Sequence, residues 1–169
     1  GIFREFGAGA EECVREGIVE KCEVSNGQKR LSGGVGGCNS VWIGLQEVKD
    51  GYVYIHDGAR PFVDGEMIER AYECVSEYHA CVAGMPSKDT VKIADGDNMV
   101  TQTPDRSSVW IVQTPQVFDA KIIKKAYAML MEQKVITVTD DAMVEEQMPG
   151  STVRLCFCDY QLLRIRTAD

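Results

Sequence analysis

The chain carries an imidazole, a carboxylate and a guanidinium group within six residues, HDGARP at 56–61. The β-prone run YVYI at 52–55 comes directly before it, and ligands of open α/β sheets bind beyond the carboxyl ends of strands. Asp57 could therefore accept hydrogen bonds from sugar hydroxyls or help to hold a metal ion, and Arg60 could bind phosphate. An Asp57–Arg60 ion pair that closes a turn is an equally good interpretation, so the spacing alone leaves both open.

Hydroxyl, cationic and carboxylate side chains also occur near the ends of other predicted strands. The residues of this kind are Thr90, Arg106, Thr114, Thr139, Asp140 and Arg164. Hydroxyl groups combined with Arg suit a phosphate monoester. Thr and Asp that only cap turns are common in proteins, and capping is the alternative interpretation.

Two glycines, Gly33 and Gly34, come shortly before a predicted helix that contains Ser40. Glycines let the backbone approach a flat ligand, and the N–H groups at a helix start are available as donors. A flexible loop is the alternative interpretation of this segment.

The composition predicts one globular domain that covers residues 1–169. The chain has 169 residues, of which 44% are hydrophobic and 26% are charged, and a chain of this length can bury a full core. Its formal net charge of −8 argues against a general nucleic-acid binder, because binding to a phosphate backbone needs a basic face. No stretch approaches the roughly 18 apolar residues of a membrane span, so we expect neither a nucleic-acid nor a membrane partner.

Seven cysteines and two histidines occur in the chain, and no CxxC pair is present. A structural zinc site needs closely spaced pairs of such ligands. Reduced, mostly buried thiols in a cytoplasmic protein are therefore the preferred interpretation. The closest pair, Cys156 and Cys158, lies in a strand-like run, and we expect the two thiols on opposite sides of that strand.

Hydrophobic spacing predicts helices that alternate with strands. The expected helices cover 10–22, 39–48, 64–75, 119–130 and 139–148, and the expected strands cover 52–55, 80–84, 110–114, 153–158 and 162–165. A Gly-rich loop is expected at 26–37. The alternation indicates an α/β fold with a mostly parallel sheet.

A predicted hairpin interrupts this alternation. The runs 89–93 and 99–103 alternate like strands and are joined by ADGDN at 94–98, and Asp-Gly between such runs is a hairpin signal. The hairpin is polar on both faces and has little to bury alone, so we interpret it as an insertion into the α/β fold.

Taken in order, these segments resemble the 2-C-methyl-D-erythritol 4-phosphate cytidylyltransferases of the non-mevalonate isoprenoid pathway. The matching segments are GG at 33–34, SV at 40–41, GL at 44–45, HDGARPF at 56–62, KDTVK at 88–92, TPDR at 103–106, Trp110, QTPQVF at 113–118 and VTDDA at 138–142. The resemblance covers nearly all of residues 10–169. It implies a Rossmann-like nucleotidyltransferase fold in which the hairpin, at about 86–110, is a dimerisation arm.

The resemblance also implies a reaction and its ligands. CTP and methylerythritol 4-phosphate would give a CDP-alcohol and pyrophosphate in a cytoplasmic homodimer, with Mg²⁺ or another divalent cation. The nucleotide-binding residues would be Gly33, Gly34, Ser40, Asp57, Gly58 and Arg60, with Asp57 also at the metal. The residues at the alditol phosphate would be Thr90, Arg106, Thr114, Thr139, Asp140 and Arg164.

The chain departs from the family pattern at several positions. The family's Gly-rich loop, with its catalytic Arg and Lys, has no counterpart here, so we expect these residues to precede Gly1 and the chain alone to be inactive. Gly37 stands where the family has Arg, and Arg164 stands where the family has Lys. The domain is therefore expected to be incomplete at its N-terminus.

Two other functions stay open from the sequence. Ribitol and other alditol phosphate cytidylyltransferases share the motifs around Asp57 and Thr114, although Lys92 and the TPDR run at 103–106 favour methylerythritol. A catalytically silent nucleotide-binding homodimer would suit the missing loop and Gly37.

Overall fold

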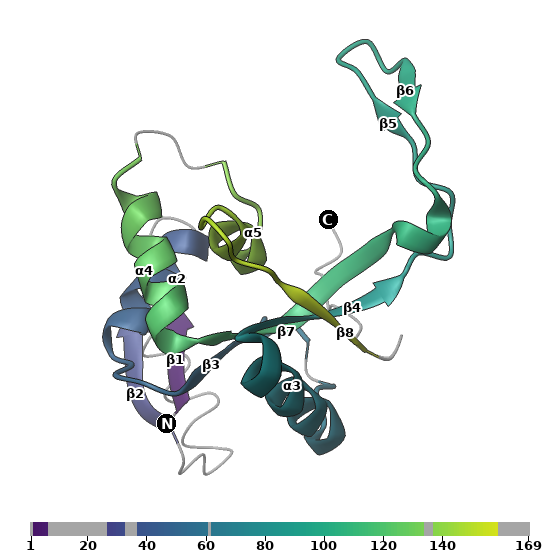
Figure 1. Ribbon diagram of the computed structural model, residues 1–169. Helices are drawn as coiled ribbons and strands as arrows, with labels where there is room; N and C mark the ends of the chain where they lie inside the picture. The colour runs from purple at the N-terminus through teal and green to yellow at the C-terminus, as the bar shows by residue number, and fades with distance from the viewer. Residues whose placement is uncertain (1, 7–26, 33–36, 61, 134–136, 159–169) are drawn as a thin grey trace. The chain divides into compact units, whose positions relative to one another are not determined.

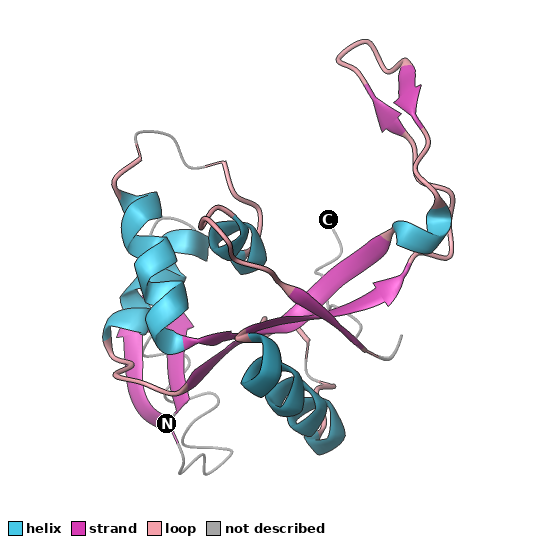
Figure 2. Ribbon diagram, viewed as in Figure 1, coloured by secondary structure: helices cyan, strands magenta, loops and turns pink. Residues whose placement is uncertain are grey.

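The computed structural model describes residues 2–6, 27–32, 37–60, 62–133 and 137–158 (Figure 1). The described helices are α2 (Gly37–Gln46), α3 (Gly65–Tyr78), the 3-10 turn η2 (Arg106–Ser108), α4 (Ala120–Met131) and α5 (Asp141–Glu146). The described strands are β1 (Ile2–Phe6), β2 (Gly27–Ser32), β3 (Tyr52–Ile55), β4 (Ala80–Pro86), β5 (Ile93–Ala94), β6 (Val100–Gln102), β7 (Trp110–Asp119) and β8 (Arg154–Phe157). The mixture of helices and strands in Figure 2 confirms the expected α/β class.

The chain divides into two compact units, each made of two stretches of sequence. The first comprises residues 1–53 and 119–149, and the second comprises residues 54–118 and 150–169. That residues 1–169 form a single domain stays a prediction. The expected helix at 10–22 and the expected strand at 162–165 lie outside the described residues.

A mixed sheet with the strand order β3-β7-β4-β8 organises the second unit. β4 pairs with β8 in parallel and with β7 in antiparallel orientation. The sheet is therefore mixed, and the expectation of a mostly parallel sheet is not confirmed. The physical reason is the inserted hairpin: it returns the chain at the end of β4, so the next long strand runs in the opposite direction.

Helix α3 covers β4 and β8 with one apolar face. Asp64 caps its start by accepting a hydrogen bond from the Met67 amide at 2.8 Å, as the sequence predicted. Met67, Ala71 and Val75 follow at helical spacing, and all three are buried. The helix ends at His79, which has a left-handed backbone with φ of 65°.

The cysteines of β8 correct one expectation. Cys156 and Cys158 are both buried, whereas Phe157 between them is 54% exposed. Residues two apart on a strand point to the same face, so the expectation of thiols on opposite sides was wrong. Cys38, Cys74, Cys81, Cys156 and Cys158 are free thiols in the described part of the chain.

The inserted hairpin forms as expected, but its paired strands are shorter than the alternating runs. β5 and β6 pair in antiparallel orientation, and Asp95 Oδ1 organises the turn by accepting from the amides of Asp97 and Met99 at 3.0 and 2.9 Å. Figure 1 shows the hairpin projecting past the ends of β4 and β7. All side chains from 92 to 103 are exposed, so within one chain the hairpin buries almost no surface.

Parallel strands and three helices make up the described part of the first unit. β1 pairs with β2 in parallel, so the expected Gly-rich loop at 26–37 is wrong at 27–32. This pairing with a distant strand, rather than local composition, decides the conformation there. Asp119 caps α4 through the amides of Lys121 and Ile122, and the helix buries Ile123, Ala126, Tyr127 and Leu130.

Among the residues that the structure describes, no helix is both long and apolar enough to cross a membrane.

Candidate functional site

A polar network forms where β3 ends, and its centre is the hydroxyl of Thr114 on β7. The Asp57 amide donates to Thr114 Oγ1 at 3.0 Å, and this oxygen lies 3.1 Å from His56 Nδ1. His56 Nε2 lies 2.8 Å from the carbonyl oxygen of Arg60. The network therefore joins the start of the HDGAR turn, residues 56–60, to a strand almost sixty residues away in the sequence, and His56 links the end of the turn to its start.

The partners of His56 assign the proton of its neutral ring. The carbonyl oxygen of Arg60 can only accept, so Nε2 must carry the proton and donate it. Nδ1 then has a lone pair, and the Thr114 hydroxyl donates to it. The same hydroxyl accepts from the Asp57 amide. In this arrangement His56 organises the backbone and is not placed as a general base.

Asp57 and Arg60 form the ion pair that the sequence left as one of two interpretations. Arg60 Nε lies 3.4 Å from Asp57 Oδ2, and the Arg60 amide donates to the Asp57 carbonyl at 3.0 Å. The Arg60 side chain is 13% exposed and that of Asp57 is 35% exposed. The carboxylate therefore remains accessible to a ligand while the guanidinium orients it. Gly58 is exposed, and a Cβ there would meet no atom within 4 Å.

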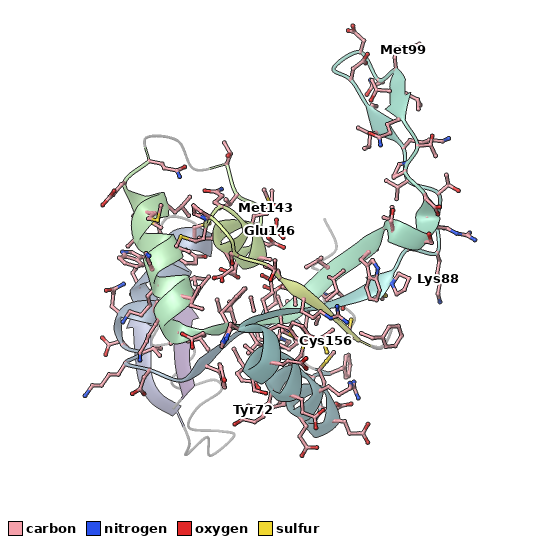
Figure 3. The ribbon with its side chains drawn as sticks, in the orientation of Figure 1. Tyr72, Lys88, Met99, Met143, Glu146 and Cys156 are labelled. Carbon is pink, nitrogen blue, oxygen red and sulfur yellow. The ribbon has the colours of Figure 1, made fainter. Side chains whose placement is uncertain are left out.

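The hairpin and its base hold a second set of the predicted residues. Arg106 Nη1 lies 3.4 Å from the carbonyl oxygen of Lys88, and Thr90 is exposed nearby in the sequence. Asp105 begins the η2 turn, and hydrogen bonds from the amide and hydroxyl of Ser107 lower the pKa of the Asp105 carboxyl. Figure 3 shows Lys88 at the base of the hairpin and Met99 near its tip.

The first unit contains the remaining described candidates. Ser40 lies on α2 and is half-buried, and Asp140 caps α5 by accepting from the Met143 amide at 2.9 Å. Thr139 donates its hydroxyl to the sulfur of Met143 at 3.1 Å. Asp140 is therefore a helix cap, and its binding of a ligand stays a prediction. Gly33, Gly34 and Arg164 lie outside the described residues.

The sequence analysis missed Tyr127 and Trp42 as site residues and named Asp141 only within the VTDDA segment at 138–142. Tyr127 of α4 donates its hydroxyl to Asp141 Oδ1, and the Trp42 ring of α2 stacks on the Tyr127 ring with a centroid distance of 6.4 Å. Helical spacing identified Tyr127 only as a core residue. No local signal could show that its hydroxyl has a carboxylate partner fourteen residues away.

No group of three or more His, Cys, Asp or Glu side chains among the described residues is arranged to hold a metal ion. Asp57 therefore offers a single carboxylate and not a complete protein cage. Such an arrangement fits Mg²⁺, which is commonly bound by one or two carboxylates together with substrate phosphates.

Solved structures share this arrangement of strands and helices. The 4-diphosphocytidyl-2C-methyl-D-erythritol synthase from Anaerococcus prevotii matches with a TM-score of 0.88 and 30% identity, over 98% of this chain and 75% of that one. The 2-C-methyl-D-erythritol 4-phosphate cytidylyltransferase from Thermus thermophilus matches with a TM-score of 0.71 and 27% identity, over 82% of this chain and 67% of that one. The fold is therefore an α/β fold with a mixed sheet, of the kind found in these transferases.

Sequence comparison gives the family. A model of the 2-C-methyl-D-erythritol 4-phosphate cytidylyltransferase family matches residues 20–169. The enzyme of that name from Lachnospira eligens is 48% identical over 143 residues, which are 83% of this chain and 63% of that protein. The one from Alkaliphilus oremlandii is 37% identical over 170 residues, which are 99% of this chain and 71% of that protein. The chain belongs to this family, and it spans less than two thirds of the length of the Lachnospira eligens relative.

Replacing Thr114 by Val tests the network at the end of β3. We expect the unfolding free energy to fall by about 1–3 kcal/mol, because the Asp57 amide and His56 Nδ1 lose their partner. The Asp57 amide should also exchange its hydrogen faster, which NMR can follow. Thr114→Ser keeps the hydroxyl and serves as the control. An Asp57 amide that exchanges equally slowly in Thr114→Val would contradict the network.

Proposed function

We propose that the protein transfers CMP from CTP to 2-C-methyl-D-erythritol 4-phosphate and releases pyrophosphate. The observation that carries this proposal is the family match over residues 20–169. In this reaction a phosphate oxygen of the alditol phosphate attacks the α-phosphorus of CTP. The bond from that phosphorus to the bridging oxygen breaks, and pyrophosphate leaves with the electron pair. The protein's contribution is positioning and electrostatic stabilisation.

The nucleotide-binding residues would be Gly33, Gly34, Ser40, Asp57, Gly58 and Arg60. We assign Gly34 and Ser40 to the cytosine and Asp57 and Gly58 to the ribose. The geometry at the end of β3 supports the second assignment: the Asp57 carboxylate is accessible, it is oriented by Arg60, and its amide is fixed by Thr114. Arg60 thus acts at the nucleotide through Asp57.

The alditol phosphate would be bound by hydroxyls and cations. The residues assigned to it are Thr90, Arg106, Thr114, Thr139, Asp140 and Arg164. Among these, the hydroxyl proton of Thr114 is already donated to His56, so Thr114 supports the site mainly by fixing the residues at 56–57. Arg106 has an exposed guanidinium next to the Lys88 carbonyl, which suits direct contact with a phosphate.

A divalent cation fits the accessible carboxylate of Asp57. When bound there together with the triphosphate, Mg²⁺ would neutralise phosphate charge as pyrophosphate leaves. Asp57 would supply one oxygen ligand, and the nucleotide would supply others.

The hairpin at about 86–110 is proposed as the contact between two copies of the chain in a cytoplasmic homodimer. Its tip exposes apolar side chains: Ile93 is 46%, Met99 66% and Val100 58% exposed. An isolated two-stranded hairpin is marginally stable in water. Burial of these side chains against a second copy would provide the stability that the hairpin lacks within one chain.

Product formation tests the proposed reaction most simply. In the complete protein that contains these residues, CTP and methylerythritol 4-phosphate should give a CDP-alcohol and one pyrophosphate, and ribitol 5-phosphate should turn over more slowly. Arg106→Ala should raise KM for the alditol phosphate by about ten- to a hundredfold, because a charge-assisted hydrogen bond is lost, and should leave KM for CTP unchanged.

Arg70→Ala is the matched control for this assay, since Arg70 lies on α3 and pairs only loosely with Glu66 at 3.7 Å. It should behave as wild type. Absence of product from the wild-type protein would refute the proposed reaction, and an equal rise of both KM values in Arg106→Ala would refute the assignment of Arg106.

Shortening the hairpin tests the proposed dimer. Deleting residues 93–99 removes Ile93 and Met99 from its apolar tip, and we expect light scattering to show a dimer for the intact protein and a monomer for the variant. The mixed sheet should persist, because β4 and β7 pair outside the deleted stretch. A dimer of unchanged stability after the deletion would place the interface elsewhere.

A further inference from the structure

A buried tyrosine connects three helices of the first unit. Tyr127 is fully buried on α4, and its hydroxyl donates to Asp141 in the first turn of α5. Its ring stacks on Trp42 of α2 with an angle of 14° between the ring planes. One side chain therefore makes a polar contact with α5 and an apolar contact with α2.

The Tyr127 hydroxyl acts as a hydrogen-bond donor. Burial, together with the neighbouring carboxylate of Asp141, raises the pKa of Tyr127 far above its ordinary value. Tyr127 therefore keeps its proton near neutral pH, and Asp141 Oδ1 is the acceptor. A buried hydrogen bond to a charged group is among the stronger contacts in a protein.

This contact fixes the turn that leads into α5. Asp140 already ties the turn to the helix through the Met143 amide at 2.9 Å, and the Thr139 hydroxyl contacts the Met143 sulfur. These contacts join the turn only to its own helix. The hydrogen bond from the Tyr127 hydroxyl to Asp141 joins the same turn to α4.

We propose that Tyr127 is a positioning residue for the alditol phosphate. It acts through Asp141, which holds Thr139 and Asp140 in the conformation that binds this substrate. The inference rests on the proposed function, which assigns these two residues to the alditol phosphate. The ring contact with Trp42 does not depend on the hydroxyl, so removing the hydroxyl should leave α2 and its Ser40 in place.

The variant Tyr127→Phe separates these two contacts in the complete protein. KM for methylerythritol 4-phosphate should rise about tenfold or more, because small displacements of positioning groups are costly. KM for CTP should stay within about twofold of wild type. Hydrogen exchange should be faster at the amides of 140–143 and unchanged in α2, a readout that does not depend on activity.

Two further variants control the experiment. Tyr54→Phe makes the same chemical change in the second unit, where the Tyr54 hydroxyl donates to the Ile68 carbonyl at 3.2 Å, and it should leave both KM values unchanged. Asp141→Asn keeps an oxygen that can accept from Tyr127, so it should impair binding of the alditol phosphate less than Asp141→Ala does.

The outcomes are distinguishable. Equal changes in both KM values, or a loss of stability alone, would overturn the positioning role. Unchanged hydrogen exchange at 140–143 would overturn the anchoring of the turn by Tyr127. A wild-type protein that makes no product would overturn the proposed function and the substrate assigned here, whereas hydrogen exchange would still decide whether Tyr127 anchors the turn.

Discussion

The conformation of the polar turn that follows β3 depends on the hydroxyl group of Thr114. Thr114 Oγ1 accepts the Asp57 amide proton and donates to His56 Nδ1, so both hydrogen-bonding functions of a single atom are used to join β7 to the turn after β3. Within this turn, Arg60 Nε lies 3.4 Å from Asp57 Oδ2 and orients the carboxylate. A ligand that meets Asp57 would find a carboxylate whose backbone is already fixed, which lowers the entropic cost of binding.

Hydrogen bonds also fix the backbone of candidate site residues in the first unit. The turn before α5 carries two residues assigned to the substrate, and its geometry comes from Asp140 as a cap and from the buried hydroxyl of Tyr127. In both units, half-buried or exposed polar residues are held by hydrogen bonds to a strand or helix that also has buried residues, β7 in one unit and α4 in the other. Phosphoryl transfer needs such preorganised groups more than it needs covalent chemistry from the protein.

Local signals predicted the capped helices well, because Asp64 and Asp119 act within three residues of their own position. Long-range pairing was not predictable in the same way. The strand at 27–32 forms because β1 lies beside it, and the antiparallel course of β7 follows from the hairpin that precedes it. Among the site residues, the turn at 56–60 was found from composition, whereas the roles of His56 and Tyr127 depend on partners that are distant in sequence.

The proton position on His56 tests the account of this network most directly. The chain has only two histidines, and the exposed His79 at the end of α3 supplies an internal reference for ¹⁵N NMR of the imidazole rings. At a pH at which both rings are neutral, the account predicts that His56 carries its proton on Nε2 and that Nδ1 accepts a hydrogen bond, with no exchange between tautomers. A neutral His56 ring with its proton on Nδ1, or one that interconverts freely as an exposed ring does, would contradict it.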